Sequence, residues 1–132
     1  VWQSSLEIIK EHPFFGVGTG DVEPELMKIY KEKNIRIALD ETLNAHNQYL
    51  QTFIALGVVG FLLLIAILLV PAWYAFQQKH LLYMAFLAIF AFNMLVESML
   101  ERQAGVTFYA FFNSFLFYYA FVNPGKSDLQ EP

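Results

Sequence analysis

The chain has 132 residues, of which 57% are hydrophobic and 15% charged, and its formal net charge is −4. This composition is apolar for a soluble domain, and an acidic chain without a basic cluster lacks the footprint of nucleic-acid binding. The absence of cysteine excludes disulfides, thiolate metal sites and a thiol nucleophile.

The charged residues are unevenly distributed. Thirteen of the twenty fall in residues 1–45, four in residues 46–125 and three in the last seven residues. This predicts a polar N-terminal third, a membrane-embedded middle and a short polar tail. Because three spans follow Val1 without a recognisable start, we expect the C-terminal piece of a longer protein with upstream transmembrane helices.

Residues 1–45 are predicted to lie outside the membrane and to contain two short helices. Apolar residues at helical spacing predict an amphipathic helix over residues 1–12, which Pro13 stops. Its apolar face fits docking on a membrane surface and packing on a neighbouring helix equally well. A second helix is predicted over about 24–34, followed by a loop over 35–45.

Three glycines at alternate positions, Gly16, Gly18 and Gly20, separate the two predicted helices. Glycine permits positive φ and leaves backbone N–H groups accessible, so such a loop can cradle an anion. The spacing is neither that of a P-loop nor that of a dinucleotide fingerprint. A plain turn is the interpretation that we favour for this loop taken alone.

The 37 residues between Glu41 and Lys79 contain no Asp, Glu, Lys or Arg. The stretch from Phe53 to Phe76 alone has 24 residues, about 36 Å of helix, which is long enough to cross a bilayer. Two further apolar stretches follow, the second rich in aromatic residues. We therefore predict an all-α, polytopic membrane protein fragment with a short helical extramembrane segment, three transmembrane helices (46–76, 81–100 and 104–122) and a polar tail (123–132).

His46 is the first candidate for chemistry, because it precedes the first span where hydrocarbon meets water. On one continuous helix from His46, Gly57 and Gly60 lie about 20° and 40° from the imidazole's direction. Glycines on one stripe let a neighbouring helix approach closely, so helix packing is predicted for both. An interfacial, solvated histidine is the alternative. His12 and His80 are predicted to be inert, and no histidine spacing indicates a metal site.

Glu97, Glu101 and Arg102 form a second candidate cluster at the end of the second predicted span. Ionisable residues within or beside spans are costly, which makes function their default hypothesis. Arg102 offers a planar guanidinium to a phosphate, or pairs with a carboxylate in a hydrated turn. If the spans alternate in direction, this cluster lies on the same side of the membrane as His46.

A family resemblance adds to this interpretation. His46-Asn47, nine residues, Gly57, two residues and Gly60 is similar to a pattern of the O-antigen ligase family: His, then Asn, Ser or Gln, nine residues, Gly, two residues, and Gly, Thr or Tyr. The stretch from Trp2 to Gly20 also resembles the family's large periplasmic loop. The resemblance covers about residues 1–65.

The resemblance implies a multi-pass protein of the bacterial inner membrane with residues 1–45 in the periplasm. Members move a glycan from undecaprenyl pyrophosphate to an acceptor hydroxyl, such as lipid A core in lipopolysaccharide biosynthesis, without a metal or cofactor. The family's histidine maps onto His46, where it assists deprotonation of the acceptor hydroxyl. Our candidates for binding substrate are Asn47, Glu97, Glu101 and Arg102, and Arg102 matches no family motif.

Several alternatives stay open at this point. Related O-antigen or exopolysaccharide polymerases and protein O-glycan ligases share this architecture. A non-catalytic membrane subunit, in which His46 and the glycines only pack helices, is a different class. The expected partners are the lipid-linked glycan donor, a glycan acceptor and membrane lipids, and no nucleic acid.

Overall fold

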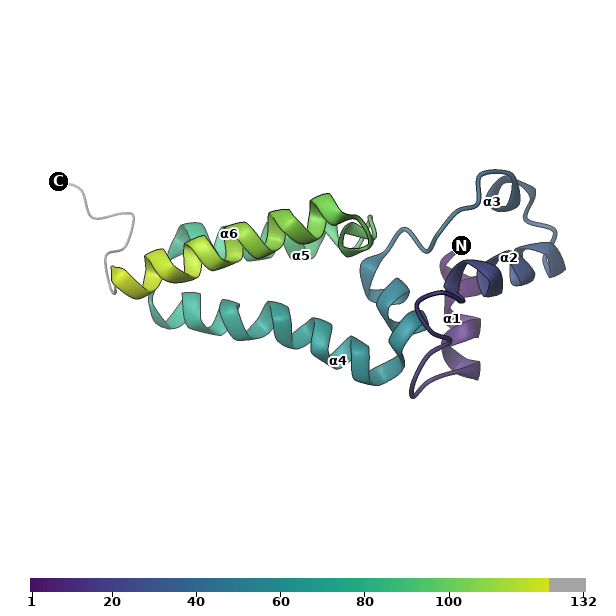
Figure 1. The fold of residues 1–132 in the computed structure, drawn as a ribbon, viewed down its shortest axis with the longest axis horizontal. Helices are drawn as coiled ribbons and strands as arrows, with labels where there is room; N and C mark the ends of the chain where they lie inside the picture. Colours follow the sequence, from purple (N-terminus) through teal and green to yellow (C-terminus); the bar gives the residue numbers. More distant parts are fainter. Residues whose placement is uncertain (124–132) are drawn as a thin grey trace. The chain divides into compact units, whose positions relative to one another are not determined.

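The computed structural model describes residues 1–123, and their regular secondary structure is helical throughout, as the all-α prediction requires (Figure 1). The chain forms two units, the first comprising Val1–Leu64 with Met94–Ser98 and the second comprising Ile65–Asn93 with the residues from Met99 onward. The predicted polar tail lies outside the described residues from position 124. The helices are α1 (Trp2–Glu11), α2 (Val22–Glu32), α3 (Arg36–Asp40), α4 (Gln48–Gln77), α5 (Leu81–Asn93), the 3₁₀ helix η1 (Met99–Glu101) and α6 (Gln103–Val122).

Helices α1–α3 form a small core in the first unit. Ile8 of α1 and Leu26 and Tyr30 of α2 are buried in it, and burial raises the pKa of the Tyr30 phenol. The sequence predicted two helices before the membrane, but α3 occupies part of the predicted loop. A helix of five residues is too short to show an apolar periodicity in the sequence. Helix α3 is stabilised by the burial of Ala38 in the same core.

Helix α4 is interrupted at Gly57, where φ is 65° and ψ is −159°. The loop after α1 fills this interruption with main-chain hydrogen bonds. The Val17 N–H donates to the Ile54 carbonyl (2.8 Å), the Gly18 N–H to the Ala55 carbonyl (2.9 Å) and the Val58 N–H to the Pro13 carbonyl (2.9 Å). The loop thus replaces hydrogen bonds that the helix loses at the break.

These contacts correct two sequence-based interpretations. A Cβ on Gly57 would collide with the backbone of Phe14 and Phe15, and one on Gly60 with the side chain of Leu56. The helix-packing stripe is therefore wrong for Gly57, because its close neighbour is a loop and not a second helix. The anion cradle is also wrong for Val17 and Gly18, whose N–H groups already donate to α4.

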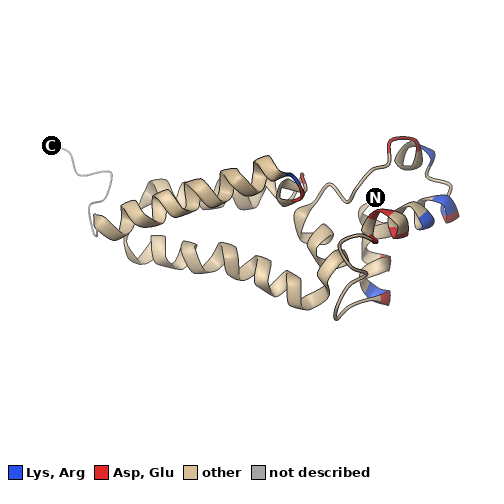
Figure 2. Cartoon of the chain, viewed as in Figure 1, with Lys and Arg blue, Asp and Glu red and all other residues tan. Residues whose placement is uncertain are grey.

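The second unit contains the rest of α4 together with α5, η1 and α6, and α5 packs against α6 (Figure 1). Figure 2 shows charged residues on α1–α3 and at the turn ahead of α6, while the apolar helices are almost free of them. Helices α4 and α6 are long and apolar enough to cross a membrane. Helix α5 has 13 residues and ends at Asn93, so the helix predicted over 81–100 is too long. That this helix forms a third membrane crossing stays a prediction.

Helix α4 continues through Pro71 to Gln77. Proline has no N–H, so it leaves the carbonyl of residue i−4, Ile67, without its helical donor. The Tyr109 hydroxyl of α6 donates to this carbonyl at 2.6 Å. One tyrosine therefore satisfies the acceptor that the proline exposes.

Tyr109→Phe is expected to destabilise the protein by about 1–3 kcal/mol, because lipid offers the Ile67 carbonyl no replacement donor. Pro71→Ala restores an N–H at position 71, so Tyr109→Phe should cost less in that background. Unfolding in detergent, measured for both single variants and the double variant, gives the coupling. An equal loss in both backgrounds would contradict this pairing.

Candidate functional site

His46 lies in the turn just before α4, and its backbone is left-handed with φ at 45°. Side chains that precede and follow His46 in the sequence accept hydrogen bonds from the backbone of this turn. The His46 N–H donates to Asn44 Oδ1 at 3.0 Å, and the Ala45 N–H donates to Gln51 Oε1 at 3.3 Å. A non-glycine residue adopts this conformation only where its surroundings fix it. The His46 side chain itself is 44% exposed, so a substrate can reach the ring.

Glu97 lies beside His46 within the first unit. Its Oε2 is 3.6 Å from His46 Nδ1, which is ion-pair distance when the imidazole is protonated, and its side chain is 39% exposed. The structure therefore brings together two site candidates from distant parts of the sequence. Because both side chains are partly exposed, the contact between His46 and Glu97 contributes little to the free energy of unfolding.

The backbone of residues 94–98 places Glu97 there. Met94 accepts a hydrogen bond from the Gln48 N–H at 2.8 Å, and Leu95 accepts one from Asn47 Nδ2 at 3.0 Å. These carbonyls satisfy donors at the start of α4 that have no partner within the helix. Because residues 94–98 serve α4 in this way, α5 ends at Asn93.

Asn47 is the N-cap residue of α4. Its Oδ1 accepts from the Leu50 N–H at 3.1 Å while its Nδ2 donates to Leu95, and the residue is buried. We predicted substrate binding for Asn47, but both amide atoms are engaged by the chain itself. Its role in the structure is to join the start of α4 to the segment that carries Glu97.

Asn47→Ala is expected to destabilise the protein by about 1–3 kcal/mol, because it removes a helix cap and the donor to the Leu95 carbonyl. Asn47→Ser keeps a capping oxygen and should cost less. Thermal unfolding in detergent ranks the two variants. A loss of activity in Asn47→Ala without any loss of stability would instead restore the substrate-binding interpretation.

The other candidates belong to the second unit. Glu101 ends η1 and Arg102 is the N-cap residue of α6, so their approach to His46 remains a prediction. His80 is buried, and its Nε2 lies 2.9 Å from the Asn123 carbonyl oxygen, which gives it a structural contact. Among residues 1–123, no group of three His, Asp or Glu side chains is arranged to hold a metal ion.

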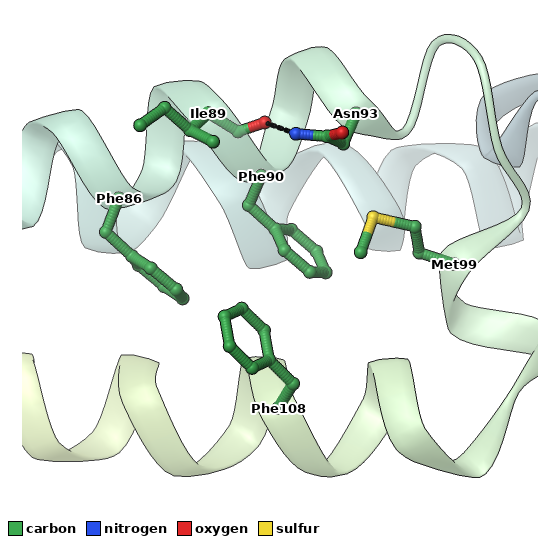
Figure 3. Close-up of a pocket in the computed structure, with 6 residues that line it drawn as sticks. All are labelled: Phe86, Ile89, Phe90, Asn93, Met99 and Phe108. Carbon is green, nitrogen blue, oxygen red and sulfur yellow. Dashed lines mark hydrogen bonds between the residues drawn. The ribbon is translucent and has the colours of Figure 1, made fainter.

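A pocket of about 390 Å³ lies between α5, η1 and α6 (Figure 3). Aromatic and aliphatic side chains line it together with Asn93, whose Nδ2 donates to the Ile89 carbonyl at 2.8 Å. None of its lining side chains is titratable, so it offers no acid or base. The pair considered for proton transfer is His46 with Glu97, in the first unit. The pocket lining consists of Phe86, Ile89, Phe90, Asn93, Met99 and Phe108.

Gln51, Met94 and Leu95 support the site but were not predicted. Backbone carbonyls carry no sequence signal. The N-cap role of Asn47 had one, because an asparagine directly before an apolar helical run is a start signal.

A comparison with protein families matches the part of the chain that holds His46. The family described as O-antigen ligase matches residues 1–65. A stretch of 80 residues is 34% identical to an uncharacterized protein of Haemophilus influenzae, covering 61% of this chain and 20% of that protein. The chain thus spans about a fifth of the length of this relative. No solved structure matches.

Proposed function

We propose, because residues 1–65 match the O-antigen ligase family, that this chain carries part of an enzyme that transfers a glycan from undecaprenyl pyrophosphate to an acceptor hydroxyl. The observation that supports this most directly is the exposed His46 beside Glu97, at the start of a helix long and apolar enough to cross a membrane. We place the reaction at the periplasmic face of the bacterial inner membrane, with residues 1–45 in the periplasm.

In the proposed reaction, His46 accepts the proton of the acceptor hydroxyl as its oxygen bonds to the anomeric carbon of the donor sugar. The bond from that carbon to the pyrophosphate oxygen breaks, and its electron pair leaves with undecaprenyl pyrophosphate. Imidazole titrates near neutral pH, and general-base catalysis contributes typically ~10²–10⁴-fold. A proton on Nδ1, facing Glu97, leaves the lone pair of Nε2 for the acceptor.

The leaving group requires compensation of its developing negative charge. Oriented donors and cations supply this in enzymes that release phosphate groups. Arg102 is our candidate within this chain, because a guanidinium forms two parallel hydrogen bonds to phosphate oxygens. The accompanying Glu101 is proposed to orient it.

Glu97→Gln is expected to lower kcat about 5-fold with little change in KM, because an exposed ion pair contributes up to ~1 kcal/mol and this one forms as His46 gains a proton. The measurement is steady-state transfer with purified full-length protein. Glu11→Gln is a control with the same change of charge, since Glu11 is an exposed carboxylate of the same unit. A change in KM alone would assign Glu97 to substrate binding, as the sequence analysis first had it.

Transfer of a radiolabelled glycan from undecaprenyl pyrophosphate tests the proposed function. Three acceptors separate the related reactions: lipid A core for a ligase, a second lipid-linked repeat unit for a polymerase, and an acceptor protein for a protein O-glycan ligase. We expect the lipid A core to be labelled. No transfer to any of the three by correctly inserted protein would favour the non-catalytic subunit.

A further inference from the structure

The loop that fills the break in α4 presents two exposed phenylalanines. Phe14 is 69% and Phe15 is 82% exposed. Both lie between Pro13 and Gly16, within a stretch from residue 13 to residue 20 that contains no charged residue. Large aromatic side chains at such exposure in an uncharged loop indicate a surface that meets an apolar phase.

The hydrogen bonds to α4 set where this loop lies. Its partners are Ile54, Ala55 and Val58, which flank the break at Gly57, so the loop contacts α4 beyond its first turn and not at Gln48. The outward side chains of α4 around this level are themselves apolar, with Leu56 45% and Val59 52% exposed. The phenylalanines thus lie beside the apolar part of a candidate membrane span.

Part of the loop's backbone is hydrogen-bonded within the protein. Irregular backbone is tolerated at membrane depth only where its polar groups are satisfied by protein. Pro13 has no N–H and its carbonyl accepts from Val58, while Gly16, Val17 and Gly18 donate to His12, Ile54 and Ala55. Phe, Trp and Leu form the membrane-buried face of helices that lie in the interface.

We infer that the loop from Pro13 to Gly18 is a membrane wedge, with Phe14 and Phe15 inserted among the acyl chains of the leaflet that α4 enters. The inference rests on the proposed function in one respect, the crossing of the membrane by α4. The wedge and the span would hold α4 at one depth, and this keeps His46 at the membrane surface. The partner is lipid hydrocarbon and not a soluble protein.

Site-directed spin labelling tests the wedge. The 132 residues of this chain contain no cysteine, and any cysteine elsewhere in the full-length protein is first replaced by serine. Phe15→Cys is labelled in the full-length protein, in vesicles of phosphatidylethanolamine and phosphatidylglycerol. Leu63→Cys on α4 and Ile37→Cys on α3 are matched controls, since these side chains are 62% and 71% exposed. Collisions with oxygen, which concentrates in hydrocarbon, are compared with collisions with a water-soluble nickel chelate.

The expected result is that the label at position 15 resembles that at position 63, with high oxygen and low nickel accessibility, whereas position 37 shows the reverse. Nickel accessibility at position 15 equal to that at position 37 would place the loop in water and overturn the inference. Low accessibility to both reagents would show that Phe15 packs against protein, which also overturns it. High nickel accessibility at position 63 would refute the crossing by α4, and the wedge with it, whereas failure at position 15 alone leaves the proposed function standing.

Discussion

Replacing His46 is expected to lower glycan transfer by ~10²–10⁴-fold, the contribution of a general base, while the protein still inserts and folds. The side chain is 44% exposed and makes its close contact with Glu97, so its loss leaves no cavity. Alanine is strained at the left-handed backbone of position 46, whereas asparagine tolerates that conformation. His46→Asn is therefore the more informative variant, because it removes the base with less effect on the turn.

Transfer of labelled glycan in vitro and surface polysaccharide in cells measure this effect. His12→Ala is the matched control, since His12 is an exposed histidine of the same unit and should retain full activity. Unfolding in detergent confirms that each variant is folded. Near-normal transfer by folded His46→Asn protein would remove His46 from the reaction and leave the family assignment of residues 1–65 unaffected.

The long elements were predicted well from sequence because their signals are local. The third span was expected over 104–122, and α6 runs from Gln103 to Val122. The first amphipathic helix was expected over residues 1–12, and α1 runs from Trp2 to Glu11. Hydropathy along the chain decides the first case, and the helical spacing of apolar residues decides the second. Glu97 was also singled out locally, as a carboxylate within an apolar stretch, and it lies beside His46.

The features that position the site could not be predicted, because they depend on backbone hydrogen bonds between distant residues. The stripe of His46, Gly57 and Gly60 assumed one continuous helix, whereas the chain is non-helical at Gly57 and α4 begins after His46. Nothing local marks Ile54 and Ala55 as acceptors for the loop at Val17. The second span was predicted too long for the same reason. Residues 94–98 do not continue α5, because the carbonyls of this segment accept hydrogen bonds from the start of α4.

Gly57→Ala is expected to destabilise the first unit by about 3 kcal/mol or more. A positive φ combined with ψ near 180° is a region that glycine alone adopts readily, which costs another residue about 1–3 kcal/mol. Overpacking adds about 1–3 kcal/mol, because the new Cβ would meet the backbone of Phe14 and Phe15. Backbone atoms held by hydrogen bonds cannot rotate away as a side chain can. Gly16→Ala should behave similarly, since its Cβ would meet the backbone of Ile54 and Ala55.

Gly20→Ala provides the matched control in the same loop. Gly20 has no heavy atom within 4 Å of an added Cβ and is not among the glycines with positive φ, so alanine should be neutral or slightly stabilising there. Thermal unfolding in detergent separates the three variants, and hydrogen exchange of the Val17 and Gly18 amides reports on the loop directly. If Gly57 instead served contact with a second helix, Gly57→Ala would leave these two amides protected. Faster exchange of both amides in Gly57→Ala and Gly16→Ala, but not in Gly20→Ala, identifies the glycine loop and the helix break as one structural unit.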